Sequence, residues 1–190
     1  MKLFKPVLAC GLLSLLAFSS CKKKEQAVSP PTPGNEFLTT VKWHFVNVSN
    51  PADTAWAVFR DSTVLSKPYK DALKPIAYLK AGATYSLTVH IYDETQTPVL
   101  DITPEIIQRE NYHLYFFFPS AALGSNFVVT AQDHDTNNPP LPVGLTNKCV
   151  TGTACSGSCE GVLRHQPNAK NGTYAPGSTD SDVHMTIIIQ

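Results

Sequence analysis

The chain has 190 residues, no formal net charge, and 16% charged against 43% hydrophobic residues. This length fits one domain with its own core. The balanced charge argues against nucleic acid or an anionic lipid surface as the main partner. Frequent Thr, Val, Tyr, Phe and Pro without long helical periodicity favour an antiparallel β domain.

The first twenty residues have the features of a bacterial export signal. Lys2 and Lys5 precede an apolar stretch at residues 7–18, and two serines follow it. The apolar stretch is shorter than the roughly 20 residues that a membrane-spanning helix needs. We therefore predict that residues 1–20 are a cleaved signal peptide and span no membrane.

The residue after the two serines is a cysteine, and the stretch Phe18-Ser19-Ser20-Cys21 resembles a bacterial lipobox. Cys10 follows a similar short pattern, but cleavage there would leave the apolar residues 11–18 exposed. The resemblance implies that Cys21 carries several acyl chains, which make a stable membrane anchor. Lys22 after the cysteine implies the outer membrane, on its periplasmic face, with the cell surface as the alternative.

Residues 21–36 join this lipidated cysteine to the rest of the chain. They contain almost no large apolar side chains, and three prolines at positions 30, 31 and 33 favour an extended backbone. We predict a tether over this segment and one folded domain over residues 37–190.

The folded part begins with period-two alternation. One face is predicted to hold Phe37, Thr39, Val41, Trp43 and Phe45, and in a second strand Tyr85, Leu87, Val89 and Ile91. Further strands are predicted at residues 54–60, 112–118, 126–131, 162–166 and 183–189. Residues 61–75 are expected to form an irregular connection or a short edge strand.

A single short helix is predicted near residues 103–109, with Thr103 as its cap and Pro104 at its first position. The strand at 112–118 is aromatic on both faces, which is typical of a central strand. Seven or eight short strands without crossover helices predict an all-β, antiparallel β-sandwich of immunoglobulin or transthyretin type.

Several segments resemble a family of small lipoproteins of the bacteroidete group. The segments are FLTTVKWHF, LKAGATYSLTVHIYDET, DITPEI, YHLYFFF, DHDTNN and VLRHQPNAKNGTYAPGSTDSDV, within residues 37–190. Members are often labelled "type 1 periplasmic binding fold superfamily", but the strand pattern favours a sandwich over that two-lobed α/β fold. The resemblance implies an accessory role beside outer-membrane uptake receptors.

The histidines suggest a metal or haem site. His44, His90 and His184 lie opposite the predicted buried face of their strands, so they would cluster if these strands are neighbours. Imidazoles placed in this way suit zinc, copper or haem iron. His113 and His165 lie in the segments that resemble the lipoprotein family, and they are either structural or ligand-binding. Isolated surface histidines are the alternative reading.

A second cation site is suggested by Asp133, Asp135 and Asn137, which place oxygen atoms at alternate positions as calcium loops do. The positions that an EF-hand reserves for Gly and Glu hold Asn138 and Gly144, so an EF-hand is excluded. A looser calcium site and a turn that hydrogen-bonds its own backbone both stay open.

Three cysteines, Cys149, Cys155 and Cys159, fall in a Gly-, Ser- and Thr-rich stretch that is predicted to be an inserted loop. In an oxidising compartment two of them are expected to pair, while metal binding by the three thiolates and three free thiols are the alternatives.

These features predict a lipid-anchored envelope protein that acts as a non-enzymatic binding or accessory subunit, with an outer-membrane receptor or a small ligand as its partner. A metal or haem carrier is the alternative. An envelope enzyme such as a glycosidase is a third hypothesis, but the chain contains none of the common nucleophile, zinc-protease or nucleotide-binding motifs.

Overall fold

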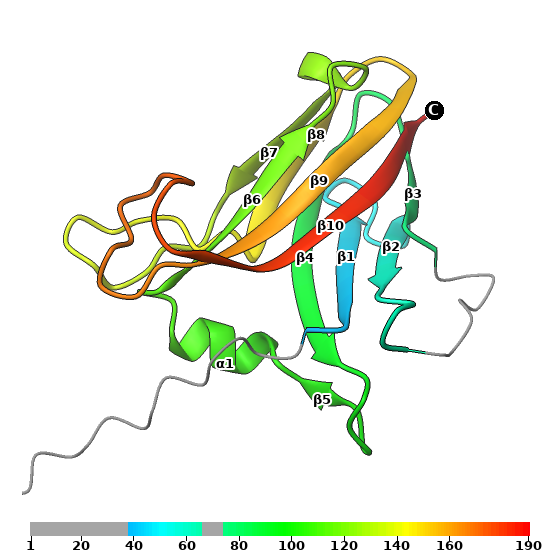
Figure 1. Ribbon diagram of the computed structural model, residues 1–190. Helices are drawn as coiled ribbons and strands as arrows, with labels where there is room; N and C mark the ends of the chain where they lie inside the picture. The colour runs from blue at the N-terminus through cyan, green and yellow to red at the C-terminus, as the bar shows by residue number, and fades with distance from the viewer. Residues whose placement is uncertain (1–37, 66–73) are drawn as a thin grey trace, which may run out of the picture. The chain divides into compact units, whose positions relative to one another are not determined.

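The computed structural model describes residues 38–65 and 74–190, which form a sandwich of two β-sheets (Figure 1). The strands are β1 (Thr40–Asn47), β2 (Thr54–Arg60), β3 (Ile76–Leu79), β4 (Thr84–Asp93), β5 (Leu100–Asp101), β6 (His113–Pro119), β7 (Phe127–Ala131), β8 (Thr146–Thr151), β9 (Cys155–His165) and β10 (Ser178–Ile189). One α-helix, α1 (Thr103–Gln108), and a 3-10 turn, Gly124–Asn126, complete the described elements. The predicted all-β, antiparallel sandwich is confirmed.

The two sheets differ in strand order. The first sheet runs β2-β1-β4-β8-β7, with β5 paired to β4, and the second runs β3-β10-β9-β6. Neighbouring strands are antiparallel except β3 and β10. Strand β8 belongs to the first sheet, whereas β9 and β10 belong to the second, so the chain changes sheet between β8 and β9.

The core follows the predicted alternation. The inward side chains of β1, β4 and β10 are buried, namely Val41, Trp43, Phe45, Tyr85, Leu87, Val89, Ile91, Val183, Met185, Ile187 and Ile189. Burial of such side chains is the main term that stabilises the fold, at about 25 cal/mol for each Å² removed from water. The hydrophobic phase of these three strands is therefore confirmed.

The predicted cysteine-containing loop is wrong. Residues 146–151 and 155–165 form strands β8 and β9. Each is an inner strand of its sheet, since β8 lies between β4 and β7 and β9 lies between β10 and β6. Small residues are needed there, because a Cβ at Gly161 would clash with the ring of Trp43 and the hydroxyl of Tyr115. Gly161 therefore reflects close packing between the sheets, whereas Ser156 and Ser158 lie at exposed positions of β9.

The prediction of a central strand at residues 112–118 is also wrong, because β6 is an edge strand of the second sheet. Its inward side chains His113 and Tyr115 are buried, but Phe118 on the outer face is 41% exposed. A short edge strand does occur on the other side of that sheet as β3, at residues 76–79. It begins just after the segment 61–75, of which residues 66–73 lie outside the described part of the chain.

The helix lies where it was predicted, but Thr103 is not its cap. Ile102 occupies the N-cap position without a side-chain hydrogen bond. The hydroxyl of Thr103 instead donates to the carbonyl oxygen of Ile91 at 3.3 Å and accepts from its N–H at 2.9 Å. Thr103 therefore fixes α1 against β4.

The predicted signal peptide, Cys21, the tether and Phe37 lie outside the described residues. Within the described ranges, none of the helices has the length and apolar character needed to cross a membrane.

Candidate functional site

Two histidines and an aspartate meet at one end of the second sheet, where β6, β9 and β10 lie side by side. His113 on β6 is paired directly with His165 on β9, and His165 is paired with Ser178 on β10. The register between β9 and β10 then shifts between Thr179 and Ser181. This irregularity falls at Asp180 and lets its side chain turn inward, as β-bulges commonly do.

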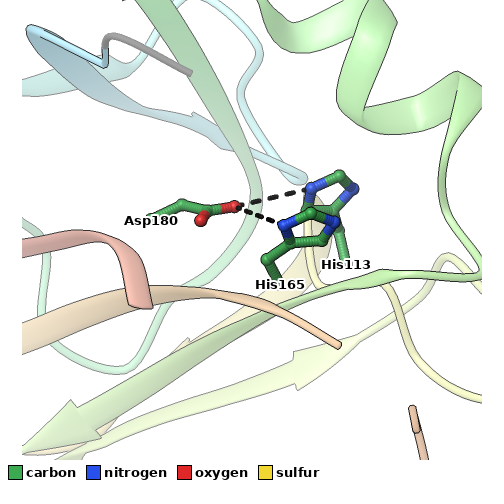
Figure 2. Close-up of side chains that lie close together, drawn as sticks. All are labelled: His113, His165 and Asp180. Carbon is green, nitrogen blue, oxygen red and sulfur yellow. Dashed lines mark ion pairs between the residues drawn. The ribbon is translucent and has the colours of Figure 1, made fainter. Parts of the chain in front are cut away.

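The three side chains approach one another closely (Figure 2). The Oδ2 atom of Asp180 lies 3.6 Å from Nε2 of His113 and 4.0 Å from Nδ1 of His165. The two imidazole rings stack with their centroids 4.9 Å apart. One ligand atom from each residue lies within 4.8 Å of the other two. We call these three residues the His-His-Asp cluster.

The cluster is almost closed to solvent. The side chains of His113, Asp180 and His165 are 1%, 3% and 12% exposed. Oδ1 of Asp180 and Nε2 of His165 are buried and have no hydrogen-bond partner. Buried polar atoms without partners are costly, by about 1–3 kcal/mol each. The cluster therefore has unused capacity to bind a ligand.

The orientation of His113 is set by the turn after α1. The Nδ1 atom of His113 lies 3.1 Å from the carbonyl oxygen of Arg109, to which it can only donate. In a neutral ring, Nε2 then carries a lone pair that faces the Asp180 carboxylate. Metal-binding histidines are commonly oriented by such a bond from the other ring nitrogen to a carbonyl oxygen.

Electrostatics favour a neutral imidazole at His165. Burial lowers the pKa of His165, and nearby His113 and Arg109 lower it further, while the Asp180 carboxylate acts in the opposite direction. A neutral imidazole is the form that binds a metal. His165 is therefore favoured in the form that a metal ion requires.

The distances also suit a metal ion. Zinc lies about 2.0–2.2 Å from nitrogen and oxygen ligands, which places tetrahedral ligands roughly 3.4 Å apart. The separation between His113 and Asp180 is 3.6 Å, close to this value, whereas His165 lies 4.0 Å from Asp180 and would have to move by about 0.6 Å toward it. Two imidazoles with one carboxylate suit zinc and other first-row metal ions, and they leave coordination positions open.

A cleft of about 300 Å³ opens on the other side of Asp180, between the ends of β1, β2 and β10. Its lining includes Thr40, Phe59, Asp61, Asp180 and Asp182. Carboxylates beside a buried site raise the local concentration of cations. Asp180 thus belongs both to the lining of the cleft and to the His-His-Asp cluster.

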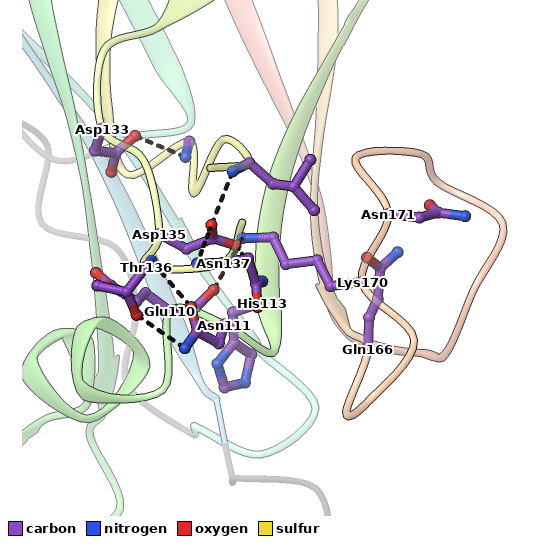
Figure 3. Close-up of polar contacts among 12 residues, drawn as sticks. Glu110, Asn111, His113, Asp133, Asp135, Thr136, Asn137, Gln166, Lys170 and Asn171 are labelled. Carbon is purple, nitrogen blue, oxygen red and sulfur yellow. Dashed lines mark hydrogen bonds and ion pairs between the residues drawn. The ribbon is translucent and has the colours of Figure 1, made fainter. Parts of the chain in front are cut away.

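Three loops next to the His-His-Asp cluster, after α1, between β7 and β8, and after β9, are fixed to one another by polar contacts (Figure 3). The ammonium group of Lys170 lies 2.7 Å from Oδ2 of Asp135 and donates to the carbonyl oxygen of Glu110 at 2.9 Å. Asn111 and Thr136 join the first two of these loops through three hydrogen bonds. These contacts hold in place the turn whose Arg109 carbonyl orients His113.

The predicted calcium loop binds protein groups instead. The carboxylate of Asp133 accepts hydrogen bonds from the backbone N–H groups of Gly144, Leu145 and Thr146. Asp135 faces the Lys170 ammonium, and the side-chain amide of Asn137 donates to Asp135. A cation site needs free oxygen lone pairs. The geometry therefore favours the alternative of a self-bonded turn, and we do not propose calcium.

The predicted cluster of His44, His90 and His184 does not form. His44 and His90 lie on the neighbouring strands β1 and β4, and both contact the ring of Trp56. His184 lies on β10 in the other sheet, 3.8 Å from Asp182. The phase of the three residues was read correctly, but the strand order places them on different sheets.

The three cysteines are free thiols in the structure. Cys149 on β8 and Cys159 on β9 are fully buried, and burial raises the pKa of each thiol to about 12. Such thiols remain protonated at neutral pH and do not act as ready metal ligands. Cys155, at the start of β9, is partly exposed.

Of the cluster residues, the sequence singled out His113 and His165 as structural or ligand-binding, but it missed Asp180. A usable signal was the phase of the histidines, since His113 shares its face with the buried Tyr115, and His165 shares its face with Leu163. Comparisons with known protein families, curated proteins and solved structures found no match to this chain.

Proposed function

We propose that this chain is a lipid-anchored metal-binding protein of the cell envelope, which holds a zinc-like ion at the His-His-Asp cluster. One observation carries the proposal. Nitrogen and oxygen atoms of His113, His165 and Asp180 converge in a buried space, and polar atoms of the last two have no protein partner. The anchor at Cys21 remains the prediction made from the lipobox-like stretch.

A carrier or binding role suits the site better than catalysis. The cluster is almost wholly buried, so a substrate of any size has little access to the ligand atoms. The bound ion would be exchanged through the cleft beside Asp180. This proposal takes the carrier alternative from the sequence, with a different set of histidines.

The test is metal binding by the full chain, purified from membranes in detergent and stripped with a chelator. Titration with Zn²⁺, and with Co²⁺ as a spectroscopic probe, is expected to show one tight site. Because the ligands act together, His113→Gln, His165→Gln and Asp180→Asn should each weaken binding by at least roughly tenfold.

Two matched controls distinguish this site from the other histidines. His44→Gln changes a residue on the first sheet, and His184→Gln changes the exposed group of Glu160, Asp182 and His184. Neither substitution should alter the affinity for zinc or the Co²⁺ spectrum. Unchanged binding in the Asp180→Asn protein, or loss of binding in His184→Gln, would refute the assignment.

A second candidate function is the accessory subunit of an outer-membrane uptake system. It is favoured by a group of aromatic side chains on the outer face of the second sheet, where the ring of Tyr174 packs edge-on against Phe116 and Phe118. Tyr174 and Phe118 are each 41% exposed. Co-purification of an outer-membrane receptor with the native protein, but not with Phe118→Ser, would support this role.

A further inference from the structure

Lys170 and Asp135 form an ion pair that is completely removed from solvent. The Nζ atom of Lys170 lies 2.7 Å from Oδ2 of Asp135, and the two side chains are 1% and 0% exposed. Lys170 follows β9, and Asp135 lies between β7 and β8. Burial lowers the pKa of Lys170, although the nearby carboxylate partly offsets this effect.

Both oxygens of the Asp135 carboxylate also accept hydrogen bonds from N–H groups of its own loop. Its Oδ1 atom accepts hydrogen bonds from two backbone N–H groups, those of Leu141 at 2.8 Å and Asn137 at 3.1 Å. The side-chain amide of Asn137 donates to the other oxygen, Oδ2, at 2.8 Å. Two N–H groups on one oxygen are the arrangement that stabilises the oxyanion of acyl-transfer intermediates.

We propose that Lys170 and Asp135 form an intramolecular amide bond. The Nζ atom attacks the Cγ atom of Asp135, while the N–H groups of Leu141 and Asn137 hold the negative charge on Oδ1. The new Nζ–Cγ bond forms and the Cγ–Oδ2 bond breaks. Two of the three ammonium protons leave with Oδ2 as water, and the third remains on the amide nitrogen, so no oxidant or cofactor is needed.

Burial makes the charged form of this pair energetically costly. Removing a carboxylate and an ammonium group from water costs several kcal/mol for each ion, and their attraction repays this only in part. Condensation replaces both charges with one neutral amide and releases a water molecule. Holding the nucleophile against the carboxyl group also corresponds to an effective concentration of about 10⁵ M or more in favourable cases.

The bond would join the loop between β7 and β8 to the loop after β9. Lys170 also contacts the Glu110 carbonyl, next to the Arg109 carbonyl that orients His113. The cross-link would therefore stiffen the surroundings of the His-His-Asp cluster. It does not depend on metal binding, so either proposal can fail without the other.

The test is the intact mass of the full chain extracted from membranes, compared with that of Lys170→Arg. Any lipid adds the same mass to both proteins, so it cancels in the comparison. After correction for the mass difference between lysine and arginine, the wild type should be lighter than Lys170→Arg by one water molecule. Tryptic digestion should give one linked peptide pair containing Asp135 and Lys170, without cleavage after Lys170.

The control is Lys148→Arg, which changes an exposed lysine on β8 and should leave the missing water and the linked peptide unchanged. The wild-type protein alone decides the question if Lys170→Arg does not fold. A wild-type mass without loss of water, together with normal cleavage after Lys170, would show that the contact is only an ion pair and overturn the proposal.

Discussion

The hydroxyl oxygen of Tyr115 on β6 accepts a hydrogen bond of 2.9 Å from the indole nitrogen of Trp43 on β1. The two residues belong to different sheets, and both are buried, so this bond crosses the interior of the sandwich. Phe117 packs against both rings, with centroids 5.0 Å from each. The bond therefore ties the first sheet to the edge strand that carries His113.

Replacing Tyr115 with Phe should destabilise the protein by about 1–3 kcal/mol, because the buried N–H of Trp43 would lose its acceptor. The measurement is the free energy of unfolding in urea. Tyr78→Phe is the matched control, since Tyr78 is 57% exposed and the substitution should have little effect. Equal stability of the two variants would show that the bond contributes nothing.

Substitution of Gly161 with Ala should destabilise the sandwich by roughly 1–3 kcal/mol or more, because there is no room for a Cβ between the sheets. The added methyl group would clash with the ring of Trp43 and the hydroxyl of Tyr115. Ser156→Ala, at an exposed position on the same strand, should leave the urea midpoint almost unchanged. A wild-type midpoint for Gly161→Ala would mean that the sheets lie further apart than the structure indicates.

The sequence predicted the strands whose alternation is strong and missed those whose side chains are small. In β1 and β4, large apolar residues at every second position leave one choice of buried face. In β9, glycine is required at position 161 because the sheets pack closely there, and glycine is also a residue that favours turns. Composition alone does not separate these two cases.

The site was harder to predict because it depends on strand order and on one bulge. His113 and His165 are far apart in the chain and meet because β6 pairs with β9. Asp180 faces them because the register shifts at this point of β10. A histidine in phase with a buried face was the available signal, whereas the exposed phase of His44 and His184 led to the wrong cluster.

The pH dependence of stability should report the buried histidines in the metal-free protein. Burial lowers the pKa of His44, His90 and His165 below 6.5, so the folded state binds fewer protons than the unfolded state. Their contribution is present above about pH 6.5 and is lost as the pH falls toward the folded pKa values.

The measurement is urea unfolding in the presence of a chelator, between neutral pH and the carboxylate range near pH 3.8. Combined substitution of His44, His90 and His165 with Gln should flatten the profile over this window. A profile that rises as the pH falls from 7 to 5 would contradict the burial of these rings.

Thiol reactivity should distinguish the three domain cysteines. In the native protein, purified without reductant, a thiol reagent should modify Cys155 first, because Cys149 and Cys159 are buried and their pKa values lie near 12. All three should react in denaturant, and Cys155→Ser should remove the fast phase. A single reactive thiol in denaturant would instead show the disulfide that export to an oxidising compartment favours.

Membrane attachment should depend on Cys21. The substitution Cys21→Ser removes the thiol that the lipobox-like stretch would expose to acylation, so incorporation of labelled palmitate should cease and the protein should move to the soluble fraction. Cys10→Ser is the matched control, and it should remain labelled and membrane-bound. If only part of the Cys21→Ser protein moved to the soluble fraction, the rest would be held at the membrane by a contact other than the lipid on Cys21. If Cys10→Ser alone abolished labelling, cleavage would occur before Cys10, and the anchor would precede the apolar residues 11–18.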